Sequence, residues 1–587
     1  MRKSRFRTSN GRKRNSLNNK ARHNHHAYSI KKRVILLGII LLAIFVLLIW
    51  RFYYLQIQQS EFYLDTFDAM RLKRERVPAY RGNIYDRNNE LLAYTRVKRF
   101  VDIGETFKGL YGNTREALIM EISDLTGFSN LEISESISSG QDIPIRPDIS
   151  VSNPSIEIVY HFNRVYNFNG SISHVIGYLN EGFQGVAGVE KTYNNSLNGT
   201  EGIKQTEIDA KTRQLKYNWL RKPEKGKNLH LSIDVHLQNY IEGLLKEFDN
   251  PSIALVSDPG TGEILSMVSL PSYESSIMTQ SMTDEKWQTI LGDERKPFLN
   301  RTIASAYNPG SLIKPFMALS SLAENEREVH TKITDRLFCE GFLEIESNMG
   351  TDPYRYKDWK ETGHGTMTLF SAIKESCNVY FYHLGMDLGI DWLKEISDQI
   401  GLAGQSGIEL PGEIDGIYPS VDWKKDRLGE RWYLGDTILT SIGQGYLQLT
   451  PVELLKLFEL VAQEGEKNRS TIISNPFTLP GQYIKLEKGN WTYLKYAMNA
   501  VVHQPGGTAY SAFYDADYSD NLAGKTGTAE TQKEGVYNAM FGGFYPLKNP
   551  EYCVIVLLEG AGYGGQNAAP VARKIFDYLL LNDAITQ

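Results

Sequence analysis

A serine and a lysine three positions apart could perform chemistry together in this sequence. Ser311 and Lys314 lie in "YNPGSLIKPF", where Pro309 and Gly310 interrupt the preceding segment and an apolar, helix-like run begins. Residues at i and i+3 lie on one face of a helix. An ammonium group that is desolvated beside a serine loses proton affinity, so the neutral amine can accept the proton of the hydroxyl and create a nucleophile. The spacing therefore predicts covalent catalysis by Ser311 with Lys314 as its base.

Two later segments make this spacing informative. S-x-x-K alone is common by chance and also fits a surface serine and lysine. "KESCNVYFYHLG" contains Ser376 and Asn378 as an S-x-N triplet in an apolar setting. "LAGKTGTAET" lies ahead of a pair of expected strands and contains Lys525, Thr526, Gly527 and Thr528. A glycine in such a strand lets a substrate backbone approach closely. The ordered set S-x-x-K, S-x-N and K-T-G is far more specific than any single motif.

The ordered set resembles the signature of penicillin-binding proteins and serine β-lactamases. The chain is similar to class B penicillin-binding proteins, the monofunctional transpeptidases of bacterial wall synthesis: "RGNIYDRNNELLA" resembles their membrane-proximal motif, and "HVIGY" and "GVAGVEKTYNNSLNGTEG" their pedestal domain. "LGDTILTSIGQGYLQLTP", "MFGGFYP" and "AAPVARKIFDYLL" most resemble the elongation branch, with the septal division enzymes as the close alternative. The resemblance implies a peptidoglycan D,D-transpeptidase that acts in cell-wall elongation and cell-shape maintenance and binds penicillin covalently.

The resemblance also assigns roles to the motif residues. Ser311 would attack the carbonyl of a D-Ala-D-Ala stem peptide, and Lys314 would be its base. Ser376 and Asn378 would relay protons and orient the peptide. D-alanine would leave, and an amine of a neighbouring stem peptide would take the acyl group. Penicillin and other β-lactams would acylate the same serine and leave slowly, and the chemistry would require no cofactor.

The K-T-G strand would hold the substrate. Lys525 would attract its terminal carboxylate, aided by Thr526 and Thr528, while Gly527 would let its backbone lie close. The backbone N–H groups of Ser311 and Thr528 would form the oxyanion hole, where the loss of one donor typically costs about 3 kcal/mol of barrier.

A second group of residues, around and inside the S-x-N segment, could bind a metal. Two thiolates, an imidazole and a carboxylate would suit tetrahedral zinc, and the residues concerned are Cys339, Asp358, His364 and Cys377. Some elongation-branch relatives look similar here, with an Asp-Asp-His-Cys site in which Cys339 would replace the first Asp. Two alternatives stay open: a Cys339–Cys377 disulfide in an exported protein, or a His364 that caps a turn. With Cys553 the cysteines number three, which excludes a complete disulfide framework.

The N-terminus predicts a single membrane anchor. "VILLGIILLAIFVLLIW", from Val34 to Trp50, carries no charge and spans roughly 26 Å as a helix, near the short end for a membrane helix. Residues 1–33 hold twelve Lys or Arg and no acidic residue, which favours a cytoplasmic tail. No small-residue cleavage site follows. We expect a bacterial inner-membrane protein with an uncleaved anchor at residues 34–54 and a periplasmic catalytic domain.

Two domains should follow the anchor in an α+β fold. Residues 55–228 are expected to form an extended pedestal of the dimerisation type, and residues 229–587 the transpeptidase domain. In the latter, "SIALVSDPGTGEILSMVSL" predicts a hairpin, "NAMFGGFYP" and "YCVIVLLEG" two further strands, and "APVARKIFDYLLL" a final helix. The resemblance implies the penicillin-binding/β-lactamase-like arrangement, an antiparallel sheet with helices on both sides and a helix-rich subdomain.

Other functions stay open at this point. A carboxypeptidase or β-lactamase of the same fold would let water reach the acyl-enzyme, although the long pedestal and anchor disfavour a β-lactamase. A β-lactam sensor would need a cytoplasmic effector domain, for which residues 1–33 are too few, and a catalytically decayed scaffold of the wall-synthesis complex would keep the pedestal. The net charge is −5 although the tail is basic, which argues against nucleic acid. The resemblance implies a rod-shape-type glycosyltransferase and morphogenesis proteins as partners.

Overall fold

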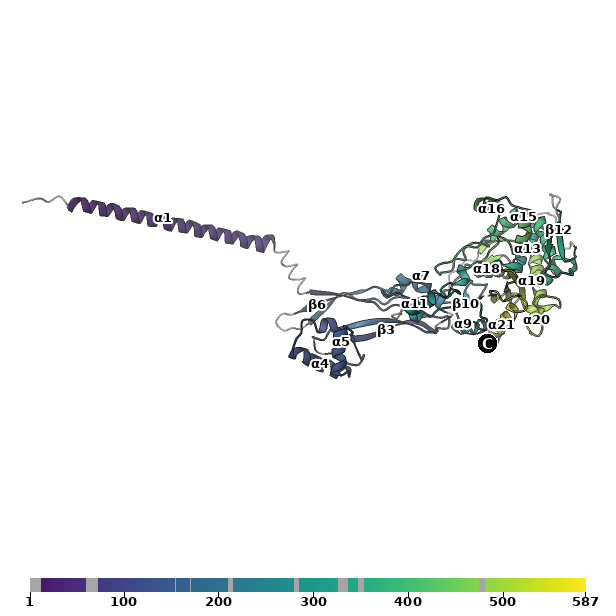
Figure 1. Ribbon diagram of the computed structural model, residues 1–587, viewed down its shortest axis with the longest axis horizontal. Helices are drawn as coiled ribbons and strands as arrows, with labels where there is room; N and C mark the ends of the chain where they lie inside the picture. Colours follow the sequence, from purple (N-terminus) through teal and green to yellow (C-terminus); the bar gives the residue numbers. More distant parts are fainter. Residues whose placement is uncertain are drawn as a thin grey trace, which may run out of the picture. The chain divides into compact units, whose positions relative to one another are not determined.

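The computed structural model divides the chain into two compact units (Figure 1). One comprises Met1–Pro78 and Glu201–Lys222, and the other comprises Ala79–Thr200 and Pro223–Gln587. The described residues are 12–59, 72–151, 153, 155–168, 170, 172–208, 215–278, 284–325, 336–346, 353–474 and 481–586. The first eleven residues of the expected cytoplasmic tail lie outside them.

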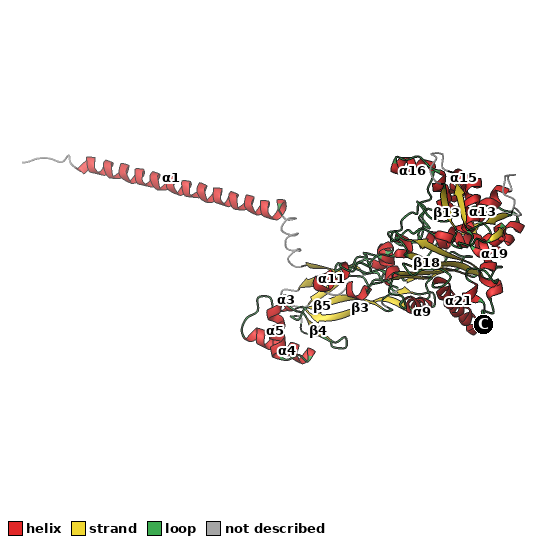
Figure 2. Ribbon diagram, turned by 45° about the vertical axis from the view of Figure 1, so that its right-hand side comes forward, coloured by secondary structure: helices red, strands yellow, loops and turns green. Residues whose placement is uncertain are grey.

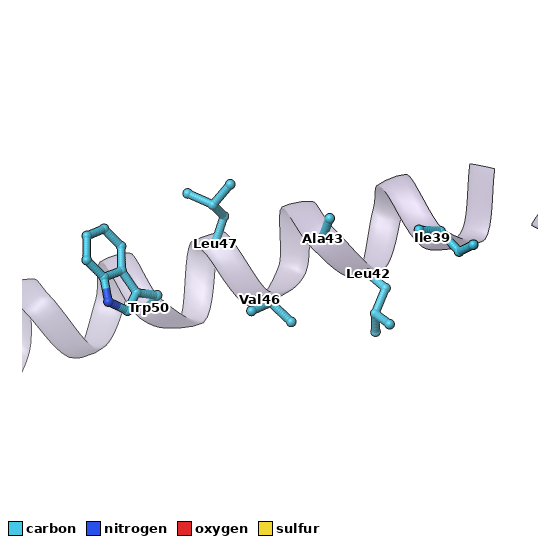
Figure 3. A pocket seen from close by; sticks show the side chains of 6 residues that line it. All are labelled: Ile39, Leu42, Ala43, Val46, Leu47 and Trp50. Atoms are coloured by element: carbon cyan, nitrogen blue, oxygen red, sulfur yellow. The ribbon is translucent and has the colours of Figure 1, made fainter. Parts of the chain in front are cut away.

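The first unit begins with a long helix, α1 (Arg12–Tyr53), which ends in a π-helical turn, η1 (Tyr54–Gln58). Its stretch Arg33–Gln58 is long and apolar enough to cross a membrane. A pocket against this helix is lined by Ile39, Leu42, Ala43, Val46, Leu47 and Trp50 (Figure 3). All backbone groups of a helix bond within the helix, and these side chains are apolar, so this surface suits a lipid environment rather than a reaction.

The same unit contains a three-stranded antiparallel sheet in the order β1–β6–β7. Its strands are β1 (Leu72–Val77), β6 (Gly202–Ile208) and β7 (Leu215–Arg221). The register of β1 on β6 runs from Leu72 opposite Glu207 to Val77 opposite Gly202. The chain therefore leaves this unit after β1 and returns to it for β6 and β7, so two distant segments build one sheet.

In the second unit, β3 (Leu91–Val101) pairs along most of its length with β5 (Ile158–Tyr166). The parallel pair of β2 (Ile84–Tyr85) and β8 (Leu229–His230) joins the start of this region to its end. Helices α4 and α5 enclose a small core of their own, in which Ile122 is fully buried. The remaining elements are β4 (Ile143–Ile145), α3 (Ile103–Thr106), α4 (Asn113–Thr126), α5 (Asn130–Ser139), α6 (Ser173–Ile176), α7 (Gly188–Thr192) and α8 (Asn194–Asn198).

A buried cluster of charged side chains connects β5 and α7 with the segment ahead of β2. The Glu190 carboxylate accepts a hydrogen bond from Arg81 Nε at 2.6 Å and another from Arg164 Nε at 2.8 Å, and all three side chains are almost fully buried. Arg81 also donates to Asn194 at 3.0 Å and to Asn198. One carboxylate thus pairs with two guanidinium groups, one from β5 and one from the segment ahead of β2.

The core of the second unit is a five-stranded antiparallel sheet in the order β10–β9–β19–β18–β17. Its strands are β9 (Ser252–Ser257), β10 (Ile264–Leu270), β17 (Ala523–Glu530), β18 (Tyr537–Tyr545) and β19 (Tyr552–Leu558). Helices α9 (Val235–Leu245) and α21 (Ala568–Thr586) pack together against one face, and α18 (Pro451–Ala462) and α19 (Lys488–His503) cover the other (Figure 2). The predicted hairpin, the two later strands and the final helix are confirmed.

A helix-rich part lies between β10 and β17 in the sequence. Its long helix, α15, packs against α13 and α17 and contacts two small antiparallel sheets of two strands each, β11–β14 and β12–β13. The elements here are η2 (Gly310–Ile313), α13 (Lys314–Asn325), β11 (Leu337–Cys339), β12 (Phe342–Ile345), β13 (Tyr354–Lys357), β14 (Gly365–Met367), α14 (Leu369–Glu375), α15 (Asn378–Ile400), α16 (Val421–Leu428) and α17 (Leu434–Ser441). Shorter elements complete the unit: α10 (Ser275–Met278), α11 (Asp284–Leu291), α12 (Arg301–Ala304), β15 (Glu466–Lys467), β16 (Gly481–Gln482), α20 (Tyr510–Phe513) and η3 (Ser519–Asn521). The predicted α+β class is confirmed.

Replacing Glu190 with glutamine should destabilise the second unit strongly. The amide keeps the volume but leaves Arg81 and Arg164 buried without a counter-charge, and removing one partner of a buried ion pair typically costs about 3–5 kcal/mol. Thermal unfolding of the full-length protein in detergent, followed by circular dichroism, should show a clearly lower midpoint. The control is Glu105→Gln, because its pair with Lys108 is exposed and such pairs contribute at most about 1 kcal/mol. Equal midpoints for the two variants would contradict this account.

Candidate active site

Ser311 lies in the 3-10 turn η2, and Lys314 is the first residue of α13. Residues i and i+3 eclipse each other in a 3-10 helix, so the predicted shared face is kept in this tighter turn. Gly310 has φ 50°, and a Cβ added there would lie 2.5 Å from the Thr528 carbonyl oxygen. Its N–H donates to the Gly443 carbonyl at 3.0 Å. The turn is therefore held between β17 and the Gly443 loop, which brings Ser311 next to Thr528.

The amine of Lys314 is fully buried and reaches the S-x-N segment. Its Nζ donates to the Ser376 carbonyl at 2.8 Å and to Asn378 Oδ1 at 2.7 Å, and it lies 3.2 Å from Ser376 Oγ. The ring of Phe381 lies 5.2 Å away. Burial lowers the pKa of Lys314 to about 8, against the opposing attraction of Asp358. A substantial share of this amine is therefore neutral near neutral pH.

The amine of Lys525 approaches the same serine from β17. Its Nζ donates to Ser376 Oγ at 2.9 Å and to the Thr526 carbonyl at 2.9 Å. Burial lowers the pKa of Lys525 well below its ordinary value, and the charge of Lys314 lowers it further. Three motifs that are far apart in the sequence thus meet at the hydroxyl group of Ser376.

The S-x-N segment is a sharp turn between two helices. Ser376 is the left-handed C-cap of α14, with φ 57°, and Cys377 is the N-cap of α15. Asn378 begins α15, so its side chain is fixed from the first helical turn. This geometry turns the hydroxyl of Ser376 and the amide of Asn378 toward the Lys314 amine.

The strand β17 lies at the edge of the five-stranded sheet, with β18 as its neighbour in the strand order. Its two threonines are held by hydrogen bonds: Thr526 Oγ1 lies 2.6 Å from Thr508 Oγ1, and Thr528 Oγ1 accepts from Gly564 N at 3.1 Å. A Cβ on Gly527 would lie 2.8 Å from Leu312 Cγ, so the strand and η2 can approach each other this closely at a glycine.

Sequence reasoning missed Thr508, Gly443 and Gly564. Each lies in a glycine-containing turn, "PGGTAY", "SIGQGY" or "GAGYGG", far from the motif it contacts. Glycine-rich turns are a signal of close backbone approach, but they do not say which strand or turn is approached. The third of these turns lies just ahead of α21.

The four predicted metal ligands come together. One potential ligand atom from each of Cys339, Asp358, His364 and Cys377 lies within 4.8 Å of the others. Asp358 Oδ2 is central, at 3.6 Å from Cys339 Sγ and 3.4 Å from Cys377 Sγ. His364 Nδ1 lies 3.6 Å from both Cys339 Sγ and Asp358 Oδ2. All three cysteines of the chain are free thiols in this structure.

This cluster also supports the catalytic turn. Asp358 Oδ2 accepts the backbone N–H groups of Asn378 at 2.8 Å and Val379 at 3.0 Å, which are free donors at the start of α15. The alternative in which His364 caps a turn receives no support from the described hydrogen bonds, since its Nδ1 faces a thiol and a carboxylate and its Nε2 is buried without a partner. Two sulfurs, one nitrogen and one oxygen in mutual reach fit the donor set of a zinc site.

A hydroxyl beside buried amines, at the edge of an antiparallel sheet, is suited to acyl transfer. Residues 252–577 match the family model of the penicillin binding protein transpeptidase domain, and residues 76–231 match that of the penicillin-binding protein dimerisation domain. The chain belongs to the penicillin-binding protein transpeptidases. The combination of the two domains is that of class B, as predicted. The predicted enzyme class, a serine-type D,D-transpeptidase, is confirmed as well.

The relatives favour the elongation branch. The chain is 30% identical to the peptidoglycan D,D-transpeptidase MrdA of Salmonella typhimurium, over 93% of the chain and 96% of the relative. It is 26% identical to the peptidoglycan D,D-transpeptidase FtsI of Buchnera aphidicola, over 74% of each protein. The likeness is thus longer and stronger to the MrdA protein, in line with the prediction of the elongation branch.

Solved structures agree with the fold. The penicillin-binding protein PBP2 in its complex with MreC from Helicobacter pylori superposes with a TM-score of 0.71 at 27% identity, covering 87% of this chain and 99% of that one. A chain from a structure titled as the coordination of polymerization and crosslinking by a peptidoglycan synthase complex superposes with a TM-score of 0.68 at 25% identity, covering 93% and 97%.

Proposed function

We propose that the protein cross-links peptidoglycan stem peptides during cell-wall elongation, with Ser311 as the nucleophile. The observation that carries this proposal is the meeting of the three motifs at Ser376, whose hydroxyl contacts the amines of both Lys314 and Lys525. The match to an MrdA protein over almost its whole length supports the substrate and the branch.

Lys314 is the base in this proposal. A neutral amine has two N–H groups and one lone pair. The contacts to the Ser376 carbonyl and to Asn378 Oδ1 use both N–H groups, which leaves the lone pair for the hydroxyl of Ser311. The serine oxygen then attacks the carbonyl carbon between the two D-alanines.

The proton taken from Ser311 leaves through Ser376. The Ser376 hydroxyl lies 3.2 Å from Lys314 Nζ and can donate its own proton to the departing amine of D-alanine while it accepts one from Lys314. The carbon–nitrogen bond breaks and the acyl-enzyme remains. In the second half of the reaction, the amine of a neighbouring stem peptide attacks the ester, gives its proton to Lys314, and the Ser311 hydroxyl is restored.

The edge strand β17 binds the donor peptide. The backbone N–H groups of Ser311 and Thr528 stabilise the developing oxyanion, and Gly527 lets η2, which carries Ser311, lie close to this strand. Thr526, with Thr508 beside it, binds the terminal carboxylate. Burial lowers the pKa of Lys525, and the arriving carboxylate favours its charged form because an opposite charge raises the pKa of an amine.

Two alternatives from the sequence differ in what they require. A decayed scaffold would tolerate loss of the catalytic side chains, whereas here they are joined by hydrogen bonds from all three motifs. A carboxypeptidase would use the same acyl-enzyme with water as the acceptor. The family match to a transpeptidase domain favours the amine acceptor.

The protein is proposed to reside in the bacterial inner membrane. Residues 34–54 form the anchor, residues 1–33 the cytoplasmic tail, residues 55–228 the periplasmic pedestal and residues 229–587 the transpeptidase domain. The apolar helix Arg33–Gln58 supports the anchor, and the basic tail supports its orientation. The PBP2–MreC complex and the synthase-complex neighbour support morphogenesis proteins and a rod-shape-type glycosyltransferase as partners.

We further propose that Cys339, Asp358, His364 and Cys377 hold a structural zinc ion. The support is the four donor atoms in mutual reach and the buried Asp358 between the two thiols. Zinc in such a site neutralises thiolates and cross-links the segments that supply them. Two of these side chains also adjoin the S-x-N turn: Asp358 caps α15, and Cys377 lies between the two residues of the S-x-N motif.

Ser311 can be tested directly by intact mass spectrometry. After incubation with benzylpenicillin, the full-length protein in detergent should gain the mass of one penicilloyl group, and Ser311→Ala should gain none. Ser320→Ala is the control, because Ser320 is a buried serine of α13, the helix that follows η2, and it donates to the Phe316 carbonyl. A folded parent without adduct, or an adduct on Ser311→Ala, would refute the assignment.

The acylation rate should rise with pH. Only the neutral form of Lys314 accepts a proton, and its pKa is about 8, so the second-order rate constant should increase from pH 6 and level off above about pH 9. Stopped-flow acylation with a fluorescent penicillin measures this second-order rate constant. Lys467→Gln is the control, since burial lowers the pKa of Lys467 to about 8 too, and its profile should match the parent. A rate that is flat or falling from pH 6 to 8 would contradict the role of Lys314.

Metal analysis tests the zinc site. Protein purified without chelators should contain one zinc per chain, and Cys339→Ala and His364→Ala should lose it and unfold at lower temperature. Cys553→Ala, which changes a buried cysteine of β19 outside the cluster, should keep it. Absence of metal from the parent would refute the proposal, and a parent 2 Da lighter under non-reducing conditions would point to the Cys339–Cys377 disulfide instead.

A further inference from the structure

Trp359 is an exposed tryptophan whose indole N–H is nevertheless committed to the catalytic turn. It follows Asp358 in the loop between β13 and β14, and 58% of its surface is exposed. Its Nε1 donates to the Ser376 carbonyl at 3.1 Å and to the Glu375 carbonyl at 3.3 Å. A large aromatic residue this exposed contributes little to the core.

The backbone that Trp359 contacts has an uncommon conformation. Ser376 has φ 57°, in the left-handed region that side chains other than glycine, asparagine and aspartate seldom adopt. Such a residue keeps its conformation only where the surroundings hold it. The N–H of Ser376 contacts the carbonyl groups of Ala372 and Ile373, the latter at a long 3.3 Å, and the carbonyl group of Ser376 accepts hydrogen bonds from outside α14.

That carbonyl is shared by two donors. It accepts Lys314 Nζ at 2.8 Å and Trp359 Nε1 at 3.1 Å. A carbonyl oxygen has two lone pairs, so it can accept both hydrogen bonds and its direction is then defined by both. Rotation of the peptide group away from Trp359 would also move the acceptor of Lys314.

We propose that Trp359 is a positioning residue for acylation: its indole N–H fixes the Ser376 carbonyl and thereby the direction of the Lys314 lone pair. The inference rests on the proposed role of Lys314 as the base. The indole ring packs edge to face against the imidazole ring of His364, with the ring centroids 5.4 Å apart and an angle of 64° between the ring planes. The indole is therefore held in place independently of its N–H, and ring and N–H can be separated by mutation.

The test is Trp359→Phe in the full-length protein in detergent. Phenylalanine keeps an aromatic ring against His364 but removes the donor. Acylation by a fluorescent penicillin, followed over a range of concentrations, separates the non-covalent dissociation constant from the limiting acylation rate. The limiting rate should fall about tenfold, as expected for one lost hydrogen bond that acts on the reacting amine, while the dissociation constant and the zinc content stay those of the parent.

Trp392→Phe is the matched control. Trp392 Nε1 in α15 also donates to a backbone carbonyl, that of Ser320 in α13, at 3.1 Å. This variant should lose stability to a similar or greater extent and keep the acylation rate of the parent. An unchanged limiting rate in Trp359→Phe, or an equal loss in both variants, would overturn the proposal. A weaker dissociation constant with an unchanged rate would also overturn it, because Trp359 would then contact the ligand. If the parent itself fails to acylate, it is the proposed function that fails.

Discussion

Desolvation of two lysine amines governs the chemistry that this protein can perform. Lys314 and Lys525 are fully buried, and both amines lie within hydrogen-bond distance of the Ser376 hydroxyl. Burial disfavours the charged form of each, and the charge of Lys314 further disfavours that of Lys525. An exposed lysine stays an ammonium ion near neutral pH, whereas here a neutral amine becomes available next to a serine. The site therefore needs neither a histidine nor a carboxylate as its base.

The sheet gives this pair of amines a rigid frame. β9 and β19 are fully or almost fully buried in its middle, while β17 lies at the edge. An edge strand offers backbone groups to an extended peptide, which is a recurring way to bind peptides. Gly310 and Gly527 let η2 approach this strand more closely than side chains would permit. The proposed nucleophile and the proposed substrate strand are thus placed by backbone contacts, which are less mobile than side chains on a surface.

The S-x-N turn is supported by the loop between β13 and β14. Asp358 caps α15 through two backbone N–H groups, and Trp359 contacts the carbonyl of Ser376. Both residues belong to the loop that also supplies His364. One short loop therefore links a buried thiol cluster to the turn that orients the base. The strained backbone of Ser376 is tolerable because so many neighbours hold it.

The sequence alone determined the fold class and the order of the motifs. The three motifs that contain Ser311, Ser376 and Lys525 identified the family. Each motif combines a reactive side chain with a local turn signal, and both can be recognised from the residue spacing. The same holds for the hairpin β9–β10 and for α21, where local periodicity decides the structure. The four residues of the thiol cluster were also found from their types, although their spacing follows no zinc-ribbon pattern.

Tertiary structure alone decided the contacts that tune the site. The lowered pKa of Lys314 depends on burial, which is a property of the packed domain and not of the S-x-x-K spacing. Strand order and loop packing bring Thr508 and Gly443 to the site. Both lie far in the sequence from the motif residues that they contact, so the sequence does not indicate these contacts. Nothing in the sequence distinguishes Trp359 from other aromatic residues. Only the structure shows that its N–H and the Lys314 amine donate to the same carbonyl group, that of Ser376. Local patterns report on local structure, whereas desolvation and shared hydrogen bonds arise only when distant segments meet.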